Sequence, residues 1–389
     1  MHPAASSLPA PDPLARAHSE RLAALIAREI DSAGGWLRFD RYMDLALYAP
    51  GLGYYAAGAH KLGDSATGGD FVTAPEISPL FGQCLAAQTA QVFTQARVRP
   101  CILEFGAGSG VLARDVLDEL ARRGITVAQY AIVEVSADLR ERQRARLADH
   151  PQVTWLDAPP AGFEGVVIAN EVLDVMPVRL FVTGESSLHE RGVVMRAGPE
   201  GSGFALESRP APADLQQAVA AIEADVASLP PGYGSEVSPV MSAWSADLSR
   251  WLARGVALLI DYGFPRREYY HPQRLMGTLM CHYRHHAHAD PLWLPGLNDI
   301  TAHVDFTAVA DAAHAAGLDV LGYATQAHFL INSGLLDFVQ RAPSPRRANE
   351  AQRLVSEAEM GELFKVLAVG RGVEVPLIGF ARGDRLDRL

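Results

Sequence analysis

The chain has 389 residues, and at about 150 residues per domain this length predicts two or three units, or one core with large insertions. Apolar residues make up 49% of the chain and charged residues 20%, a composition that excludes global disorder. The net charge of −11 has the wrong sign for a protein that coats nucleic acid or anionic lipid. No apolar run approaches the roughly 18 residues of a membrane span, so none is expected.

The cysteine and histidine patterns argue against a disulfide framework and against a metal site. The three cysteines are far apart and form no C-x-x-C pair, which fits a reducing compartment such as the cytoplasm. The four histidines between His282 and His288 lack helical ligand spacing and a cysteine partner, so no metal is expected. Lys61 and Lys365 are the only lysines among 34 basic residues, a bias that indicates a GC-rich bacterial genome.

The N-terminal part of the sequence predicts helices followed by a glycine-rich loop. Residues 1–18 are rich in Pro and Ala and are expected to form a disordered N-terminus. Helices are expected at 19–33 and 40–49, because Gly or Pro ends each of these runs. Residues 50–79 follow as a loop, and the whole of 19–80 is expected to cover the functional site.

Further along the chain, short apolar strands alternate with helices, which predicts an α/β fold with a parallel sheet and helices on both faces. The pattern changes over 178–254, where Gly and Ser separate hairpin strands that are followed by two helices. We therefore expect an inserted α+β lobe on the substrate side, between two parts of the core, 81–177 and 255–389. The core strands are expected at 101–105, 130–135, 153–156, 165–170, 255–261, 318–323 and 363–370.

The central motif is the run from Glu104 to Gly110, EFGAGSG, which lies where an apolar strand ends and a helix begins. Gly106, Gly108 and Gly110 allow a sharp turn and a close approach of a ligand to the backbone amides. Their G-x-G-x-G spacing differs from the G-x-G-x-x-G that a dinucleotide pyrophosphate prefers, and it favours S-adenosylmethionine. The helix N-terminus would face the methionyl carboxylate of this cofactor, and Glu104 would face its ammonium group. Glycines at such a turn also occur for packing alone.

Polar side chains follow the next three predicted strands. Glu134 follows the second strand, where a carboxylate can accept hydrogen bonds from both ribose hydroxyls. Asp157 follows the third strand and would accept from the adenine amino group. Asn170 and Glu171 follow the fourth strand and would lie beside the sulfonium. Because ligands of open α/β sheets bind at the carboxyl ends of the strands, these ends together predict a cofactor site.

Seven segments of the chain carry a family resemblance: GDFVTAPEISPLFGQ, LEFGAGSG, IVEVS, IANEVLDVMPV, LLIDYG, PGLNDITAHVDF and MGELFKVL. From Tyr42 to Val369 the chain resembles the MidA-like class I S-adenosylmethionine-dependent methyltransferases, which include the mitochondrial complex I assembly factor that methylates an arginine. The resemblance implies a Rossmann-like sheet of seven strands with the last one antiparallel, plus an inserted lobe. It also implies S-adenosylmethionine as cofactor, S-adenosylhomocysteine as product, and as substrate a protein arginine, with a respiratory-complex subunit as one candidate partner.

Methylation of an arginine makes a chemical demand, because a guanidinium with a pKa above about 12 is a poor nucleophile. Glu171 and Glu76 are expected to hold the guanidinium and to localise its charge on the nitrogens that do not react. Asp70 is expected to close over the cofactor, and His303 to act as a base on the substrate side. Asn170 counts among both the cofactor and the catalytic residues. Structural alternatives stay open: Glu76 also suits a helix N-terminus, Asp70 a turn, and His303 a helix start.

Other functions remain open from the sequence. A small-molecule methyltransferase is one, because the glycine-rich segment and the insertion can enclose either a small pocket or a peptide groove. An assembly factor that binds the cofactor without turnover is another, although the intact glycines and acids argue against it. The glycine spacing disfavours a nicotinamide oxidoreductase. The oligomeric state is open, a homodimer included, and residues 50–75 are the candidate lid.

Overall fold

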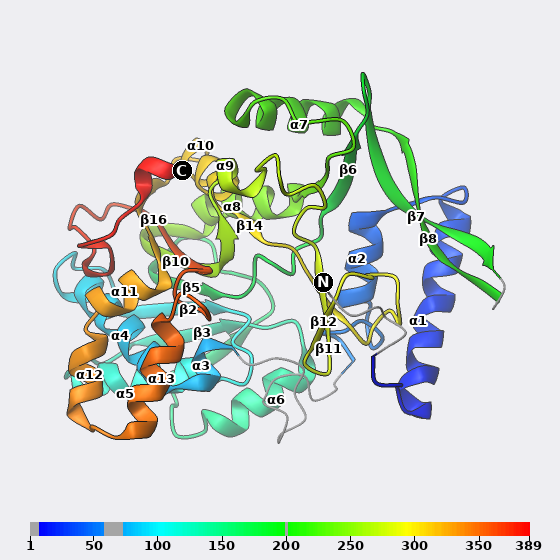
Figure 1. Ribbon diagram of the computed structural model, residues 1–389. Coiled ribbons are helices and arrows are strands. Elements are labelled where there is room, and N and C mark those ends of the chain that lie inside the picture. The colour runs from blue at the N-terminus through cyan, green and yellow to red at the C-terminus, as the bar shows by residue number, and fades with distance from the viewer. Residues whose placement is uncertain (1–7, 58–72, 199–200) are drawn as a thin grey trace. The chain divides into compact units, whose positions relative to one another are not determined.

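The computed structural model describes residues 8–57, 73–198 and 201–389 (Figure 1). The chain divides into two compact units, each built from three separate stretches. The lobe unit comprises Met1–Phe71, Asp174–Met241 and Phe264–His303, and the sheet unit comprises Val72–Leu173, Ser242–Gly263 and Val304–Leu389. The lobe unit therefore groups the N-terminal helices with most of the segment that the sequence predicts as an insertion. The domain boundaries themselves remain a prediction from the sequence.

A mixed sheet forms the centre of the sheet unit. Its strands are β2 (Cys101–Phe105), β3 (Gln129–Val133), β4 (Val153–Leu156), β5 (Phe163–Asn170), β10 (Leu252–Phe264), β15 (Asp319–Thr325) and β16 (Phe364–Arg371), and the short β14 (Val304–Asp305) pairs with β10. Their spatial order is β4-β3-β2-β5-β10-β16-β15. Neighbours from β4 to β10 run parallel, whereas β16 is antiparallel to both β10 and β15. The predicted α/β sheet of seven strands with the last one reversed is confirmed.

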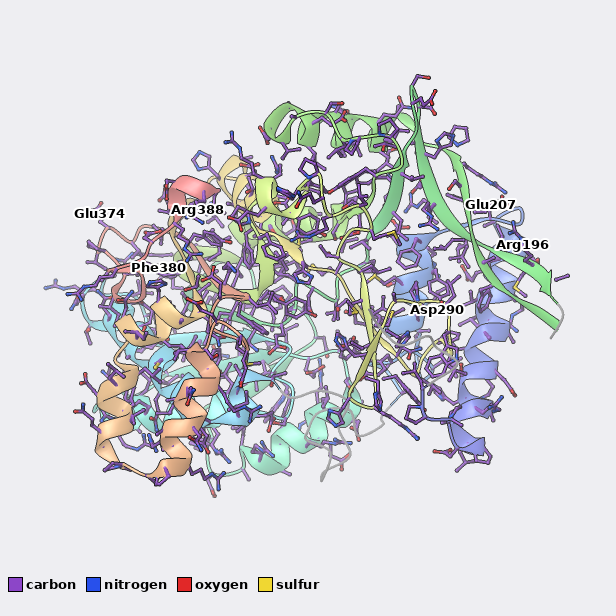
Figure 2. The ribbon with its side chains drawn as sticks, viewed as in Figure 1. Arg196, Glu207, Asp290, Glu374, Phe380 and Arg388 are labelled. Atoms are coloured by element: carbon purple, nitrogen blue, oxygen red, sulfur yellow. The ribbon has the colours of Figure 1, made fainter. Side chains whose placement is uncertain are left out.

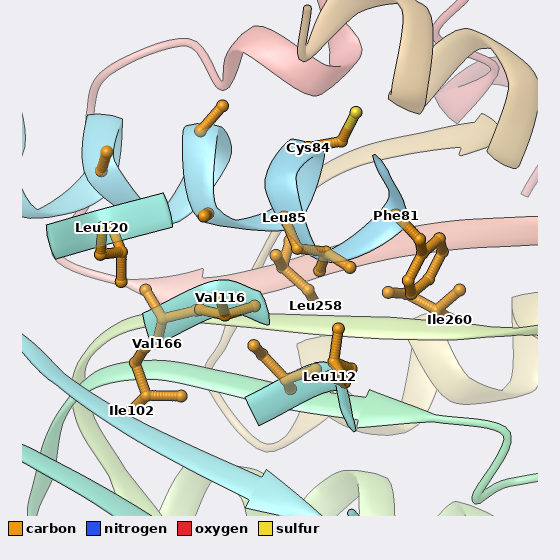
Figure 3. Packing of buried hydrophobic residues seen from close by; sticks show 14 of the residues in the cluster. Phe81, Cys84, Leu85, Ile102, Leu112, Val116, Leu120, Val166, Leu258 and Ile260 are labelled. Atoms are coloured by element: carbon orange, nitrogen blue, oxygen red, sulfur yellow. The ribbon is translucent and has the colours of Figure 1, made fainter. Parts of the chain in front are cut away.

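Helices α4 (Pro79–Thr94) and α5 (Val111–Arg122) pack against one face of this sheet. In Figure 3, Leu85 of α4 lies close to Leu258 of β10, and Val116 of α5 lies close to Val166 of β5. All four side chains are fully buried. Burial of one such side chain stabilises the fold by roughly 1.5–3 kcal/mol. Strand β2, which lies between α4 and α5 in chain order, therefore holds the glycine motif at a fixed edge of the sheet.

Helix α8 (Pro239–Trp251) contributes aromatic residues to the opposite face. Successive residues of a strand point to opposite sides, so Phe105 faces away from the side that Ile102 covers. The Phe105 ring lies 5.1 Å from the ring of Trp244 and 5.5 Å from that of Trp251. This aromatic group fixes the last residue of β2, immediately before the glycine loop begins.

Some of the other helices of the sheet unit begin with a side-chain cap. The Ser136 hydroxyl accepts from the Leu139 amide at the start of α6, and Ser344 accepts from Arg347 at the start of α13. Such caps satisfy amides that have no partner within the helix. The other helices of the sheet unit are α3 (Ala74–Ile77), α6 (Ala137–Arg146), α10 (Phe306–Ala315), α11 (Gln326–Asn332), α12 (Leu335–Arg341), α13 (Pro345–Val355), η2 (Ile378–Phe380) and η3 (Leu386–Arg388).

The lobe unit begins with helix α1 (Pro13–Ser32), which starts earlier than the sequence predicts. Asp12 caps the helix by accepting from the Ala15 amide at 2.9 Å, and Pro13 occupies the first turn, where its missing N–H costs nothing. Residues 13–18, expected to be disordered, are therefore helical. Residues 1–7 lie outside the described part of the chain.

Two small sheets complete the lobe unit. One has the order β1-β7-β6-β9 with β8 paired to β7, and the other the order β12-β11-β13. Figure 2 labels Arg196 and Glu207 on the β7–β8 hairpin, where Nη2 and Oε2 lie 3.8 Å apart. The elements are β1 (Leu37–Arg38), α2 (Phe39–Tyr48), β6 (Arg179–Thr183), β7 (Leu188–Gly198), β8 (Gly201–Pro210), α7 (Ala213–Val226), β9 (Gly234–Val237), α9 (Arg266–Tyr269), β11 (Met280–Tyr283), β12 (His286–His288) and β13 (Asp299–Thr301). Among the described residues, no helix is long and apolar enough to cross a membrane.

Candidate cofactor and active site

The glycine loop between β2 and α5 has a backbone that ordinary residues rarely adopt. Gly106, Gly108 and Gly110 have φ values of +61°, +54° and +82°, and Gly110 caps α5 in the left-handed region. A Cβ atom on Gly106 would lie 3.3 Å from Cγ2 of Val172, which follows Glu171 in the loop after β5. The sequence-predicted glycines thus form a tight turn that adjoins the end of β5.

Glu104 is buried just before this loop. Its Oε2 accepts a hydrogen bond of 2.8 Å from the Tyr130 hydroxyl on the neighbouring strand β3. The pKa of Glu104 is raised to about 8, because burial disfavours the carboxylate and the charge of Glu134 adds to the effect, while the Tyr130 hydrogen bond opposes it. A buried acid with a raised pKa is suited to a cationic ligand group, which would stabilise its charged form.

Glu134 follows β3 and is also buried. Its carboxylate accepts from the Ser136 amide at 2.9 Å and from Nε2 of Gln143 at 3.1 Å. Burial raises the pKa of Glu134, and these hydrogen bonds oppose the rise. The next residue, Val135, leaves 78% of its surface exposed, an unusual position for an apolar side chain beside a buried acid. An adenosine group can use both features, a carboxylate for the ribose and an apolar surface for the ring.

Asp157, after β4, is arranged differently. Its side chain is 94% exposed and pairs with Nη1 of Arg140 at 2.7 Å. Arg140 also donates to the main-chain carbonyls of Glu134 at 2.6 Å and Leu156 at 2.8 Å. One guanidinium therefore joins the carboxyl ends of β3 and β4. The predicted adenine contact of Asp157 is untested, and its side chain is held by Arg140.

Asn170 is the last residue of β5, and Glu171, which follows it, has a strained backbone. Glu171 has a φ of +54°, which costs a residue with a Cβ on the order of 1–3 kcal/mol. The Glu171 amide donates to the Ile260 carbonyl at 2.9 Å, and the Leu173 amide donates to Asp261 at 2.9 Å, so β10 holds the turn. The Asn170 amide nitrogen lies 3.2 Å from Glu171 Oε1. The Oδ1 atom of Asn170 is buried and accepts no hydrogen bond from the residues that the structure describes.

The other predicted catalytic residues are placed in different parts of the chain. Glu76, on α3, accepts a short hydrogen bond from the Ser109 hydroxyl, so it adjoins the glycine loop. Arg146 donates to the same hydroxyl at 2.9 Å. His303 belongs to the lobe unit, where its ring stacks on Phe264 at 5.3 Å. Asp70 lies outside the described residues.

The sheet unit brings most of the predicted cofactor residues to the carboxyl ends of adjacent strands, beside three further residues that the sequence does not indicate. Gln143 and Arg140 lie on the polar helix α6, and the sequence does not distinguish them from the solvent-exposed residues of that helix. Val135 shows its significance only through its exposure. Within the described ranges, no group of three or more His, Cys, Asp or Glu side chains could hold a metal ion.

These residues fit S-adenosylmethionine. The buried acid Glu104 suits an ammonium group, the carboxylate of Glu134 suits a ribose, and the buried Oδ1 of Asn170 is available to a donor on a ligand. The strand order, the reversed β16 and the left-handed glycine turn define a class I methyltransferase sheet.

Comparison with known proteins agrees with this class. Residues 84–324 match the family model Methyltransf_28, described as "Putative S-adenosyl-L-methionine-dependent methyltransferase". The chain belongs to this methyltransferase family.

Two solved structures from Burkholderia thailandensis are similar over nearly the whole chain. One, bound to S-adenosyl-homocysteine, is 49% identical with a TM-score of 0.93, and covers 98% of this chain and 100% of its own. The other is 47% identical with a TM-score of 0.89 and the same coverage. Among curated relatives, "Protein arginine methyltransferase NDUFAF7, mitochondrial" from Danio rerio is 28% identical, over 87% of this chain and 84% of its own. The Mus musculus protein of that name is 29% identical, over 84% and 79%.

Proposed function

We propose that this methyltransferase transfers the methyl group of S-adenosylmethionine to an arginine side chain of a protein. The observation that carries the proposal is Glu171, an acid held in a left-handed conformation beside the glycine loop. Backbone strain of this kind gathers at functional sites, where it sets the direction of a side chain. The name of the curated relatives, protein arginine methyltransferase, supports the same substrate.

Residues at the carboxyl ends of the strands are assigned to successive parts of the cofactor. The glycine loop would hold the methionyl part, the N-terminus of α5 would face its carboxylate, and Glu104 would face its ammonium group. Glu134 accepts from the ribose hydroxyls, and Val135 packs on the adenine ring. Asp157 accepts from the adenine amino group, in competition with Arg140. Asn170 lies beside the sulfonium.

Bound S-adenosylmethionine supplies a methyl group on a positively charged sulfur, and the C–S electron pair stays on sulfur as the new N–C bond forms. Glu171 and Glu76 hold the guanidinium and orient one nitrogen toward the methyl group. The nitrogen that gains the methyl group loses one proton, and Glu171 is the assigned acceptor. The proposal also includes the two roles expected from the sequence, Asp70 as a cover over the cofactor and His303 as the alternative base to Glu171 on the substrate side.

The setting of the reaction is part of the proposal. We place it in the bacterial cytoplasm, with a respiratory-complex subunit as one candidate substrate and a homodimer as one candidate assembly. The amino-acid bias toward arginine and the Burkholderia relatives support a bacterial source.

Methyl labelling tests the proposal. The purified protein is incubated with radiolabelled S-adenosylmethionine and a lysate of cells that lack this gene, with Gly106→Val as the control. Label in a discrete protein band, recovered as methylarginine after hydrolysis, is expected. Label confined to small molecules would contradict the protein substrate, and its absence despite cofactor binding would contradict turnover on any component of that lysate.

A further inference from the structure

Gln143 is the buried side chain of the polar helix α6, and it contacts three parts of the candidate site. Its Nε2 donates to the Gly108 carbonyl at 2.9 Å and to Glu134 Oε2 at 3.1 Å. Its Oε1 accepts from the indole N–H of Trp155 on β4 at 2.9 Å. One amide therefore connects the glycine loop after β2, the acid after β3 and the strand β4.

The chemistry of the three partners fixes which way the amide points. The indole N–H of Trp155 can only donate, so it requires the oxygen of Gln143. The Gly108 carbonyl and the ionised Glu134 carboxylate can only accept, so they require its nitrogen. A reversed amide would lose all three hydrogen bonds. Trp155 thus orients Gln143, and Gln143 orients Glu134.

The Glu134 carboxylate has its two oxygens held separately. Oε1 accepts from the Ser136 amide, which belongs to the backbone, and Oε2 accepts from Gln143. Without Gln143, the carboxyl group would keep its backbone hydrogen bonds, and Oε2 would lose the side-chain hydrogen bond that Gln143 donates. A bidentate contact with two ribose hydroxyls requires the plane of the carboxylate to be set, because both oxygens must face the diol.

We propose that Gln143 is a positioning residue for cofactor selectivity, which sets the Glu134 carboxylate for a vicinal diol while it holds the glycine loop. This rests on the proposed function, in which Glu134 binds the ribose of S-adenosylmethionine. Gln143 touches protein atoms and acts on the cofactor through Glu134. Its loss should therefore weaken ligands that carry the ribose diol more than ligands that lack it.

The test uses calorimetric titration of the full chain with S-adenosylhomocysteine and with its 2′,3′-dideoxy analogue. Gln143→Met removes the three hydrogen bonds and keeps the length of the side chain. Gln88→Met is the matched control: Gln88 is buried in α4 of the same unit and bonds Gln91 and the Gly379 amide, each at 2.9 Å.

Gln143→Met is expected to weaken S-adenosylhomocysteine about tenfold to a hundredfold, since hydrogen bonds to a charged group are lost. The loss of affinity for the dideoxy analogue should be at least about fivefold smaller, because the diol and Gln143 are coupled through Glu134. Gln88→Met should leave both affinities within about threefold of wild type. If circular dichroism shows that Gln143→Met is unfolded, Trp155→Phe is measured instead. This variant should reduce the ratio of the affinities for S-adenosylhomocysteine and the dideoxy analogue about twofold to fivefold.

Equal losses for both ligands, or no loss for either, would overturn the positioning role. So would a wild-type protein that binds S-adenosylhomocysteine but does not prefer it to the dideoxy analogue, and in that case the proposed function would stand. A wild-type protein that binds neither ligand would overturn both proposals.

Discussion

The Tyr130 hydroxyl donates a hydrogen bond of 2.8 Å to Glu104, from one parallel strand to the next. This hydrogen bond partly offsets the burial that raises the pKa of the Glu104 carboxyl. At neutral pH the isolated protein therefore holds a mostly protonated acid at the place where the proposed cofactor has a positive charge. Cofactor binding and loss of a proton should be linked.

Cofactor affinity should depend on pH through Glu104. Its pKa of about 8 means that binding of an ammonium group below pH 8 must displace a proton, so affinity should rise from pH 6 to pH 8 and level off above. The slope should approach, at most, about tenfold per pH unit. Titration calorimetry with S-adenosylhomocysteine, in buffers of different ionisation enthalpy, would measure the released proton. Glu104→Gln should flatten the profile, and a wild-type affinity that is constant over this window would refute the linkage.

The same group should lower the stability of the cofactor-free protein at alkaline pH. The pKa of Glu104 in the folded protein is above its unfolded value of 4.5. The contribution of its protonated form to the free energy of unfolding is therefore complete below about pH 4.5 and is lost as the pH rises through about 8. Glu104→Gln removes this loss, so at pH 8.5 it should unfold at a higher temperature than wild type while binding the cofactor more weakly. Thermal unfolding at pH 5 and pH 8.5 would show the difference, and an equal effect at both pH values would count against it.

Gly106→Val should abolish cofactor binding and leave the protein folded. The added side chain would meet Val172 and would have to adopt a φ of +61°. Gly124→Val is the matched control, because Gly124 has a φ of +73° but nothing within 4 Å of its added Cβ. Both variants should lose similar stability in urea, and only Gly106→Val should lose binding of S-adenosylhomocysteine. Wild-type affinity in Gly106→Val would show that the site is elsewhere.

Glu171→Gln should separate binding from turnover. Loss of the carboxylate removes the proposed proton acceptor and guanidinium ligand, so turnover should fall about 10²–10⁴-fold while cofactor affinity stays within a few-fold. Glu164→Gln, at an exposed position of β5, the strand that precedes Glu171, is the control and should be near wild type. Single-turnover methyl transfer would measure the effect. An unchanged rate would move the role to Glu76 or Asp70.

The sequence alone predicted the sheet because its strands are short apolar runs with a clear alternation, and it predicted the glycine turn because only glycine adopts that backbone freely. It located Glu104, Glu134 and Asn170 through their positions at strand ends. It could not predict Gln143, since a buried glutamine in a polar helix has no local signature. Arg140 is hidden for the same reason, and its contacts appear only when β3 and β4 are adjacent.

The left-handed backbone of Glu171 also bears on how this protein would change if its chemistry were no longer needed. Glycine or asparagine would adopt that conformation at lower free energy, so drift at this position should favour them once turnover ceases to matter. The glutamate in this chain occupies the position against the preference of the backbone. Position 171 can therefore serve as a marker in relatives: chains that keep the acid are expected to be enzymes, and chains with glycine are candidates for a cofactor-binding role without turnover.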